Sequence, residues 1–199
     1  MQLQADNIAC QRGGREVFAG LNFTVRAGEA LQVAGSNGAG KSSLLRAIAG
    51  LVALSGGRLA LEGGDTEASI GEQAHYLGHQ DAVKGALSVS ENLQFWIAYL
   101  GGRGSAAAAL KAVGLGAVAD LPAGYLSAGQ KRRLSIARLI AAKRRLWLLD
   151  EPASCLDAAA QKMLAGLMQT HLKSGGLIVA ASHGSIGLKR GRLLRLGPV

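Results

Sequence analysis

The sequence predicts an α/β fold in which a core of buried strands is interrupted by a helical segment at about residues 85–125. Hydrophobic residues make up 49% of the 199-residue chain, which is enough to build a sizeable core. Strand patterns dominate the first third, helical patterns the middle, and a strand–helix–strand alternation the last third. The 29 glycines are scattered between apolar stretches, which favours tight turns and close approach of the backbone to ligands.

Individual elements follow from hydrophobic periodicity. Alternating or continuous apolar residues predict strands at 3–9, 17–25, 29–34, 58–61, 74–77, 146–149 and 177–181. The last two are short uninterrupted apolar runs, which are typical of central strands buried on both faces. Helical spacing predicts helices at 41–50, 90–100, 105–113, 128–142 and 157–173. Pro122 and the glycines near it mark the expected exit from the helical segment.

Composition argues against several classes of protein. No apolar run reaches the roughly 18 uncharged residues that a membrane-spanning helix needs. The first residues lack the basic and apolar regions of a secretory signal. Cys10 and Cys155 stand far apart, so a disulfide framework or a zinc site is not expected. These features favour a reduced, cytosolic, globular protein.

The net charge of +9 comes from 22 Lys+Arg against 13 Asp+Glu. Much of it lies in one run, which comprises Lys131, Arg132, Arg133, Arg138, Lys143, Arg144 and Arg145. We interpret this run as a solvated helix face, and the alternative is a face that lies near anionic lipid headgroups. Basic runs without interleaved aromatic residues seldom bind nucleic-acid bases, so no nucleic-acid partner is expected.

The strongest motif is a full GxxxxGK[ST] match between a strand-like ALQVA and a helix-like SSLLRAIAG. It comprises Gly35, Ser36, Asn37, Gly38, Ala39, Gly40, Lys41 and Ser42, and Ser43 follows it. Glycines allow successive backbone N–H groups to face one concavity, where the helix dipole also favours phosphate. The lysine adds a positive charge for the β- and γ-phosphates, and the hydroxyl after it can ligate Mg²⁺. The motif therefore predicts binding of a nucleoside triphosphate, with ATP and Mg²⁺ as expected cofactors.

An acidic pair completes this predicted site. Asp150 and Glu151 directly follow the apolar run LWLL and precede Pro152. Asp150 is expected to hold Mg²⁺, directly or through water, and Glu151 to polarise the attacking water as general base.

Four further motifs follow in a set order along the chain. They are Gln80 in YLGHQD, Ser127 to Gln130 in LSAGQ, Asp157 in EPASCLD and His183 in VAASHG. Together with the phosphate loop and the acidic pair they resemble the motifs of ATP-binding-cassette (ABC) ATPases, with Ala128 where glycine is commoner. Ser127 also stands where its side chain would cap the following helix.

The resemblance implies a P-loop NTPase fold of the ABC ATPase type: a mixed sheet core, an antiparallel β subdomain and an inserted helical subdomain, in a single nucleotide-binding domain over residues 1–199. It implies a homodimer of cassettes, in which each ATP lies between one phosphate loop and the partner's LSAGQ motif. Glu151 and His183 would be catalytic, and Ser42, Gln80 and Asp150 would hold Mg²⁺. Nucleotide contacts would come from residues 35–43, Gln80, Ser127, Gly129, Gln130 and Asp157.

One position departs from the family pattern. ABC ATPases usually place an aromatic residue about 29 positions before the lysine of the phosphate loop, to stack on adenine. Here that position is Arg12, and Phe18 lies six residues later. A guanidinium can stack on a base, so Arg12 can take this role. The alternative is a turn residue without any contact to the base.

Longer stretches resemble a narrower family, the ATP-binding subunits of bacterial cytochrome c biogenesis (haem exporter) complexes. They are GSNGAGKSSLLRAIAGL, YLGHQDAVKGALSVSENLQFW, LSAGQKRRLSIARL and LWLLDEPASCLD. The resemblance implies separate membrane subunits like CcmB, CcmC and CcmD, a peripheral location on the cytoplasmic face of the inner membrane, and ATP hydrolysis linked to release of a haem-loaded chaperone. The histidines and cysteines lack CxxCH spacing, so this chain is not expected to bind haem. The alternatives are the ATPase of another bacterial exporter and a soluble non-transport ABC module.

Overall fold

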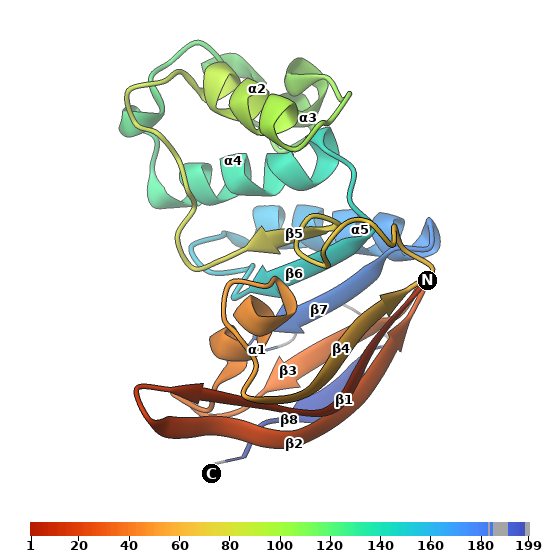
Figure 1. Ribbon diagram of the computed structural model, residues 1–199. Coiled ribbons are helices and arrows are strands. Elements are labelled where there is room, and N and C mark those ends of the chain that lie inside the picture. The colour runs from red at the N-terminus through yellow and green to blue at the C-terminus, as the bar shows by residue number, and fades with distance from the viewer. Residues whose placement is uncertain (183, 185–190, 198–199) are drawn as a thin grey trace. The chain divides into compact units, whose positions relative to one another are not determined.

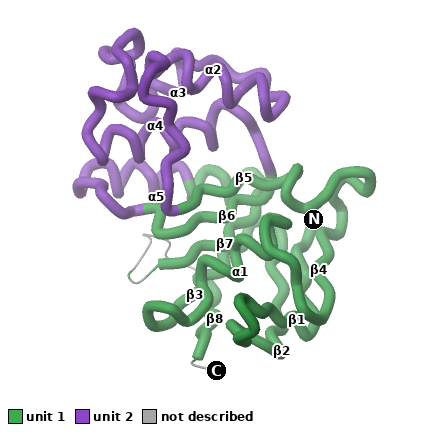
Figure 2. Tube along the Cα trace, turned by 60° about the vertical axis from the view of Figure 1, so that its left-hand side comes forward, with its two compact units in different colours: residues 1–78, 145–152, 168–199 green, residues 79–144, 153–167 purple. Residues whose placement is uncertain are grey.

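The computed structural model describes residues 1–182, 184 and 191–197, which form two compact units. The first comprises residues 1–78, 145–152 and the chain from 168 onward, and the second comprises 79–144 and 153–167 (Figure 2). The chain thus leaves the first unit twice and returns to it twice. No described helix is both long and apolar enough to cross a membrane. His183 lies outside the described residues.

The first unit contains two sheets (Figure 1). An antiparallel sheet has the order β2 (Arg15–Arg26), β1 (Gln2–Arg12) and β4 (Gly56–Glu62). A parallel sheet has the order β5 (Ala74–Leu77), β6 (Leu146–Asp150), β7 (Leu177–Ala181), β3 (Ala30–Ala34) and β8 (Arg192–Arg195). The predicted α/β class with an antiparallel part is confirmed. The sequence did not predict β8, because this edge strand is only four residues long and its sequence, RLLR, has no apolar alternation.

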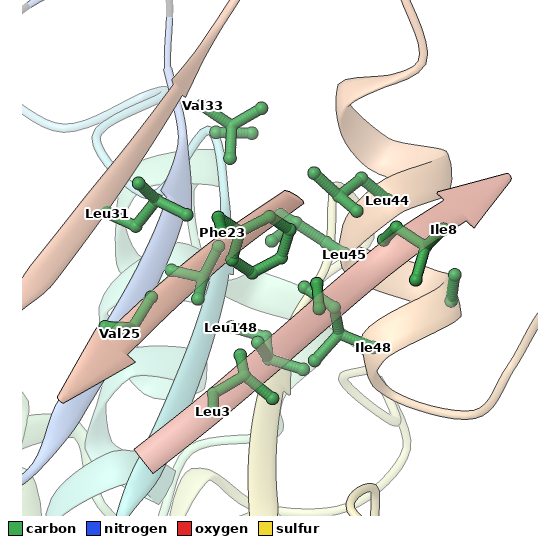
Figure 3. Packing of buried hydrophobic residues seen from close by; sticks show 14 of the residues in the cluster. Leu3, Ile8, Phe23, Val25, Leu31, Val33, Leu44, Leu45, Ile48 and Leu148 are labelled. Carbon is green, nitrogen blue, oxygen red and sulfur yellow. The ribbon is translucent and has the colours of Figure 1, made fainter. Parts of the chain in front are cut away.

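One hydrophobic core fills the first unit (Figure 3). Helix α1 (Lys41–Ile48) buries Leu44, Leu45 and Ile48 in it. The antiparallel sheet contributes Ile8, and the parallel sheet contributes Val33. Because α1 begins directly after the glycine loop, the burial of its apolar face also fixes where that loop lies.

The second unit is helical. It contains α2 (Val89–Tyr99), α3 (Ala106–Ala112), η1 (Gly116–Val118), η2 (Ala123–Tyr125), α4 (Ala128–Ala141) and the first part of α5 (Ala158–Lys173). Serine side chains cap α2, α3 and α4 at their N-termini. The insertion expected at about 85–125 lies inside this wider unit, and the organisation of residues 1–199 as a single nucleotide-binding domain stays a prediction.

The interpretation of the basic run as a solvated helix face is wrong for two of its members. Arg132 and Arg138 on α4 are 2% and 6% exposed. Arg132 forms an ion pair with Asp81, with Nη1 and Oδ1 3.1 Å apart. The guanidinium carbon of Arg138 lies 4.4 Å from the centroid of the Trp96 ring. These partners come from other segments of the helical unit, so the charge pattern of α4 alone cannot identify them.

Candidate nucleotide-binding site

The glycine loop joins β3 to α1 and turns through left-handed glycine conformations. Gly38 and Gly40 have φ values of 83° and 92°, which side chains rarely adopt. A Cβ on Gly35 would lie 2.7 Å from the carbonyl oxygen of Leu196, so this end of the loop also requires glycine. Ser36, Asn37 and Gly38 are exposed, whereas Ala39 is buried.

Lys41 is held directly over this loop. Its side chain is 8% exposed, and Nζ donates hydrogen bonds to the carbonyl oxygens of Gly35 at 2.9 Å and Ser36 at 3.0 Å. The ammonium is therefore held by the backbone of the loop, next to the start of α1. Ser42 and Ser43 follow in the first turn of α1, half-buried. This arrangement suits an anion with several oxygens, such as a triphosphate.

The acidic pair stands at the carboxyl end of β6, in the same compact unit. Every residue of β6 is buried, and Asp150 at its end is 3% exposed. Glu151 adopts a left-handed backbone with φ 45°, and its N–H donates to the carbonyl oxygen of Ala181 at 2.9 Å. Such a conformation is uncommon outside glycine and is often found at functional sites. Helix α1 packs against β6 and β7, so the first unit holds the phosphate loop and the acidic pair together.

Two side chains that the sequence analysis did not single out belong to this acidic site. The Arg46 Nε–H donates to the Tyr76 hydroxyl, with 3.3 Å between Nε and the oxygen. Burial raises the pKa of Tyr76, the Arg46 hydrogen bond opposes this, and the neighbouring Asp150 carboxylate raises the pKa further. Tyr76 pairs with Leu148 in the parallel sheet, two residues before Asp150. The pairing of β5 with β6 is what brings them together, and no local motif indicates it.

The residues around Asp150 fit Mg²⁺ held together with a nucleotide. Mg²⁺ usually takes one or two protein oxygens and completes its octahedron with phosphate oxygens and water. Ser42 and Asp150 supply a hydroxyl and a carboxylate of this kind. Within the described part of the chain no three His, Cys, Asp or Glu side chains gather as a metal cage. Gln80, the third expected ligand, belongs to the helical unit, and its contact with Mg²⁺ stays a prediction.

The LSAGQ motif forms the start of α4, in the helical unit. Ser127 caps the helix as expected: Ser127 Oγ accepts from the Gln130 N–H at 3.2 Å, and Gln130 Oε1 accepts from the Ser127 N–H at 2.9 Å. A Cβ on Gly129 would lie 2.7 Å from the Cys155 carbonyl oxygen. The structure therefore brings the LSAGQ motif against the EPASCLD segment, and this close contact requires a glycine at position 129.

Asp157 and Gln80 also lie in the helical unit. Asp157 Oδ1 accepts from the Ala160 N–H at 2.7 Å, so it satisfies a donor at the start of α5. Gln80 is exposed. The next residue, Asp81, is anchored to α4 by its ion pair with Arg132 and by the Ser135 hydroxyl, whose Oγ lies 2.5 Å from the Asp81 carbonyl oxygen. The residue beside Gln80 is thus fixed to the helix that carries the LSAGQ motif.

Known proteins resemble this chain over most or all of its length. Residues 18–154 match the family described as ABC transporter. The chain is 56% identical to the cytochrome c biogenesis ATP-binding export protein CcmA of Bradyrhizobium diazoefficiens over the full length of both chains. It is 62% identical to the protein of the same name from Rhodopseudomonas palustris, over 99% of this chain and 98% of the relative. A putative ABC transporter ATP-binding protein of Pyrococcus furiosus has a similar fold, with a TM-score of 0.84 at 20% identity over 98% of both chains.

Proposed function

From its membership of the ABC transporter family and, within it, of the CcmA proteins, we propose a function for this chain. It is the ATP-hydrolysing subunit of a membrane complex for haem export and cytochrome c maturation. The observation that carries the ATPase part is the position of Lys41 over the glycine loop, in one compact unit with Asp150 and Glu151. The cytochrome c part rests on the similarity to CcmA proteins over the whole chain.

The site residues divide the work of hydrolysis. The glycine loop and the start of α1 bind the phosphates through backbone N–H groups, and Lys41 neutralises charge on the β- and γ-phosphates. Ser42 and Asp150 would hold Mg²⁺, which when bound supplies positive charge opposite the phosphate oxygens. Glu151 orients the attacking water and accepts its proton. His183 and Gln80 would act at the γ-phosphate.

The second half of each site comes from a second copy of the chain. Ser127, Gly129 and Gln130 lie at the N-terminus of α4, where the backbone offers donors to a phosphate. In a head-to-tail dimer this end would meet the γ-phosphate bound by the partner's glycine loop. ATP then joins the two copies, and hydrolysis removes the contact that depends on the γ-phosphate.

The proposed partners are membrane subunits like CcmB, CcmC and CcmD, on the cytoplasmic face of the inner membrane. Closing and opening of the ATPase dimer would drive the release of a haem-loaded chaperone from that complex. The haem chemistry would take place on the partners, since this chain lacks CxxCH spacing.

The ATPase part is tested with Glu151→Gln, which keeps the shape of the side chain but removes the base. We expect this variant to bind Mg-ATP without hydrolysing it and to form a stable dimer in light scattering. Lys41→Ala is the matched control, which should lose ATP and stay monomeric under the same conditions. A monomeric Glu151→Gln variant at saturating Mg-ATP contradicts the site shared between two copies.

The transport part is tested by gentle purification of the tagged chain from membranes and mass spectrometry of the accompanying proteins. Membrane subunits of cytochrome c maturation are the expected result. A different permease would make the chain the ATPase of another exporter. The absence of any membrane partner would favour a soluble ABC module.

A further inference from the structure

The helical unit contains an open cavity of about 440 Å³ beside the end of α4. The loop that joins α2 to α3 lines one side of it, and the end of α4 lines the other. The lining residues are Gly101, Gly102, Arg103, Gly104, Ile140, Ala141 and Lys143. None of them belongs to the nucleotide site described above, so the proposed ATP hydrolysis leaves this cavity without a function.

Glycines hold the loop tightly against α4. A Cβ on Gly102 would lie 2.9 Å from Ala142 Cβ, and a Cβ on Gly104 would collide with the carbonyl oxygen of Ala141. The Gly104 N–H also donates to that oxygen at 3.1 Å. The backbone of Arg103 is therefore fixed between two glycines in close contact with α4, and the wall of the cavity exists before any ligand binds.

The charged side chains at this cavity are all positive. Arg103 and Lys143 line it and are exposed, and no carboxylate of the described residues forms an ion pair with either. Arg144 follows directly: its Nη2–H donates to the Leu100 carbonyl oxygen at 2.7 Å, and its buried Nε has no hydrogen-bond partner among the described residues. An anion with several oxygens, such as a phosphate group, is the ligand that such cations bind.

The helix that precedes the loop carries exposed aromatic side chains. Phe95 and Tyr99 on α2 are 42% and 72% exposed, and their rings stack with centroids 6.0 Å apart. Lys84 Nζ lies 4.6 Å from the centroid of the Phe95 ring. Tyr99 is two residues before Gly101, the first residue of the cavity. Exposed aromatic rings next to cations are typical of surfaces that bind a membrane, where the rings meet the lipid interface and the cations meet the phosphates.

We propose that this cavity binds the headgroup phosphate of an anionic lipid, while Phe95 and Tyr99 enter the lipid interface beside it. The phosphate supplies the negative charge that Arg103 and Lys143 lack within the described chain. The aromatic pair favours a lipid over a free phosphate ion, which has no apolar part to meet the rings. The inference goes beyond the proposed function, because it gives the chain a direct contact with the bilayer that does not depend on ATP.

The test measures how the purified full-length chain sediments with phosphatidylcholine vesicles that contain phosphatidylglycerol. The double variant Arg103→Gln/Lys143→Gln should bind them about thirtyfold more weakly than the wild type, since each cation near an anionic surface contributes about fivefold. Lys111→Gln/Lys162→Gln is the matched control, which removes the same charge from exposed positions elsewhere in the helical unit. Because salt screens distant charges, this control should stay within about threefold of the wild type. Circular dichroism checks that each variant is folded.

A second set of vesicles separates a phosphate site from general attraction to negative charge. These vesicles contain oleate in place of phosphatidylglycerol, at the same measured surface potential. The oleate carboxylate lies too deep in the interface to enter the cavity, so we expect the wild type to bind these vesicles more weakly.

Trp96 reports whether α2 itself enters the interface. Its ring contacts those of Phe95 and Tyr99, with centroids 5.5 Å and 5.7 Å away, whereas the second tryptophan of the chain, Trp147, is 4% exposed in the other compact unit. Lipids with brominated acyl chains should therefore quench the emission of Trp96 and leave that of Trp147 as background. The double variant Phe95→Ser/Tyr99→Ser should bind the vesicles more weakly.

Four results would overturn the proposal. They are an equal loss in the two charge variants, equal binding to oleate vesicles, vesicle binding without quenching of Trp96, and binding of inorganic phosphate by a chain that binds no vesicles. Cavity variants that bind vesicles as the wild type but no longer copurify with membrane proteins would make this face a protein contact, which also overturns it. Lys41→Ala should lose ATP and still bind vesicles, so failure of the lipid site and failure of the nucleotide site are distinguishable.

Discussion

Replacement of Arg132 by Ala should destabilise the helical unit substantially. The guanidinium of Arg132 is 2% exposed and pairs with Asp81, whose side chain is 23% exposed. Removing one partner of a fully buried ion pair costs about 3–5 kcal/mol. Water can reach part of the Asp81 carboxylate. Arg138 also interacts electrostatically with both Asp81 and Arg132, so it still offsets part of the Asp81 charge when Arg132 is removed. We therefore expect a loss of about 2–3 kcal/mol in the free energy of unfolding.

A double-mutant cycle with Asp81→Asn separates the pair from the packing of the arginine stem. Urea unfolding followed by circular dichroism gives the free energies, and Arg132→Met serves as a control that retains the apolar stem. The two charge-removing variants should be clearly non-additive. Strict additivity, or single losses below about 0.5 kcal/mol as in an exposed ion pair, would refute the reasoning.

The same variant should affect catalysis more than nucleotide binding. Asp81 directly follows Gln80, and its carbonyl oxygen accepts from Ser135 on the helix that carries the LSAGQ motif. Loosening this connection should lower the ATPase kcat, while the ATP affinity of a single chain, which in the proposed site comes mainly from the glycine loop, should change little. A large loss of ATP affinity with normal kcat would contradict the proposed separation.

Gly129→Ala would bring a Cβ to 2.7 Å from the carbonyl oxygen of Cys155, so we expect it to lower the ATPase activity. Ala128→Gly, at the exposed neighbouring position, is the control and should keep an activity close to that of the wild type. Gly40→Ala places a side chain at φ 92° and 2.6 Å from Val17; we expect about 1–3 kcal/mol of destabilisation in thermal unfolding, and an unchanged Tm would argue against the close contact. Burial lowers the pKa of His171 below its ordinary value of 6.5, despite the backbone hydrogen bonds that raise it. Between the pKa of the folded state and about pH 6.5 the unfolded state therefore binds more protons than the folded one. The free energy of unfolding falls as the pH is lowered through this range and levels off below the folded pKa. The variant His171→Phe should lack this part of the pH dependence. If urea unfolding shows that wild type and variant lose equal free energy of unfolding between about pH 7.5 and about pH 5.5, the pH dependence does not come from His171.

Local motifs predicted the conformation of the glycine loop and the helix start after it, where these features are contiguous in the chain. The loop from Gly35 to Ser43 combines glycine conformations, a lysine and a helix start within nine residues, and the structure has all three. The same holds for the serine cap at Ser127, because capping depends on residues three positions apart. Two roles stay predictions: the binding of one ATP between the glycine loop of one copy and the LSAGQ motif of another, and the catalytic role of His183.

Interactions between distant segments could not be predicted in this way. Tyr76 and Arg46 join the acidic site through the pairing of β5 with β6 and the placement of α1. Charge was also a poor guide to exposure on α4. Arg132 and Arg138 look like members of a basic solvated face, and their burial depends on partners from other segments, Asp81 and Trp96.

The sequence by itself determined the fold class, most elements and the phosphate loop, because hydrophobic periodicity, glycine conformation and helix capping act over a few residues. Tertiary structure alone decided which charged side chains are buried, why position 129 must be glycine, and which strand of the parallel sheet lies beside Asp150. The physical reason is that burial and strand register depend on contacts between segments far apart in the chain, and a side chain's own neighbours in sequence do not specify those contacts.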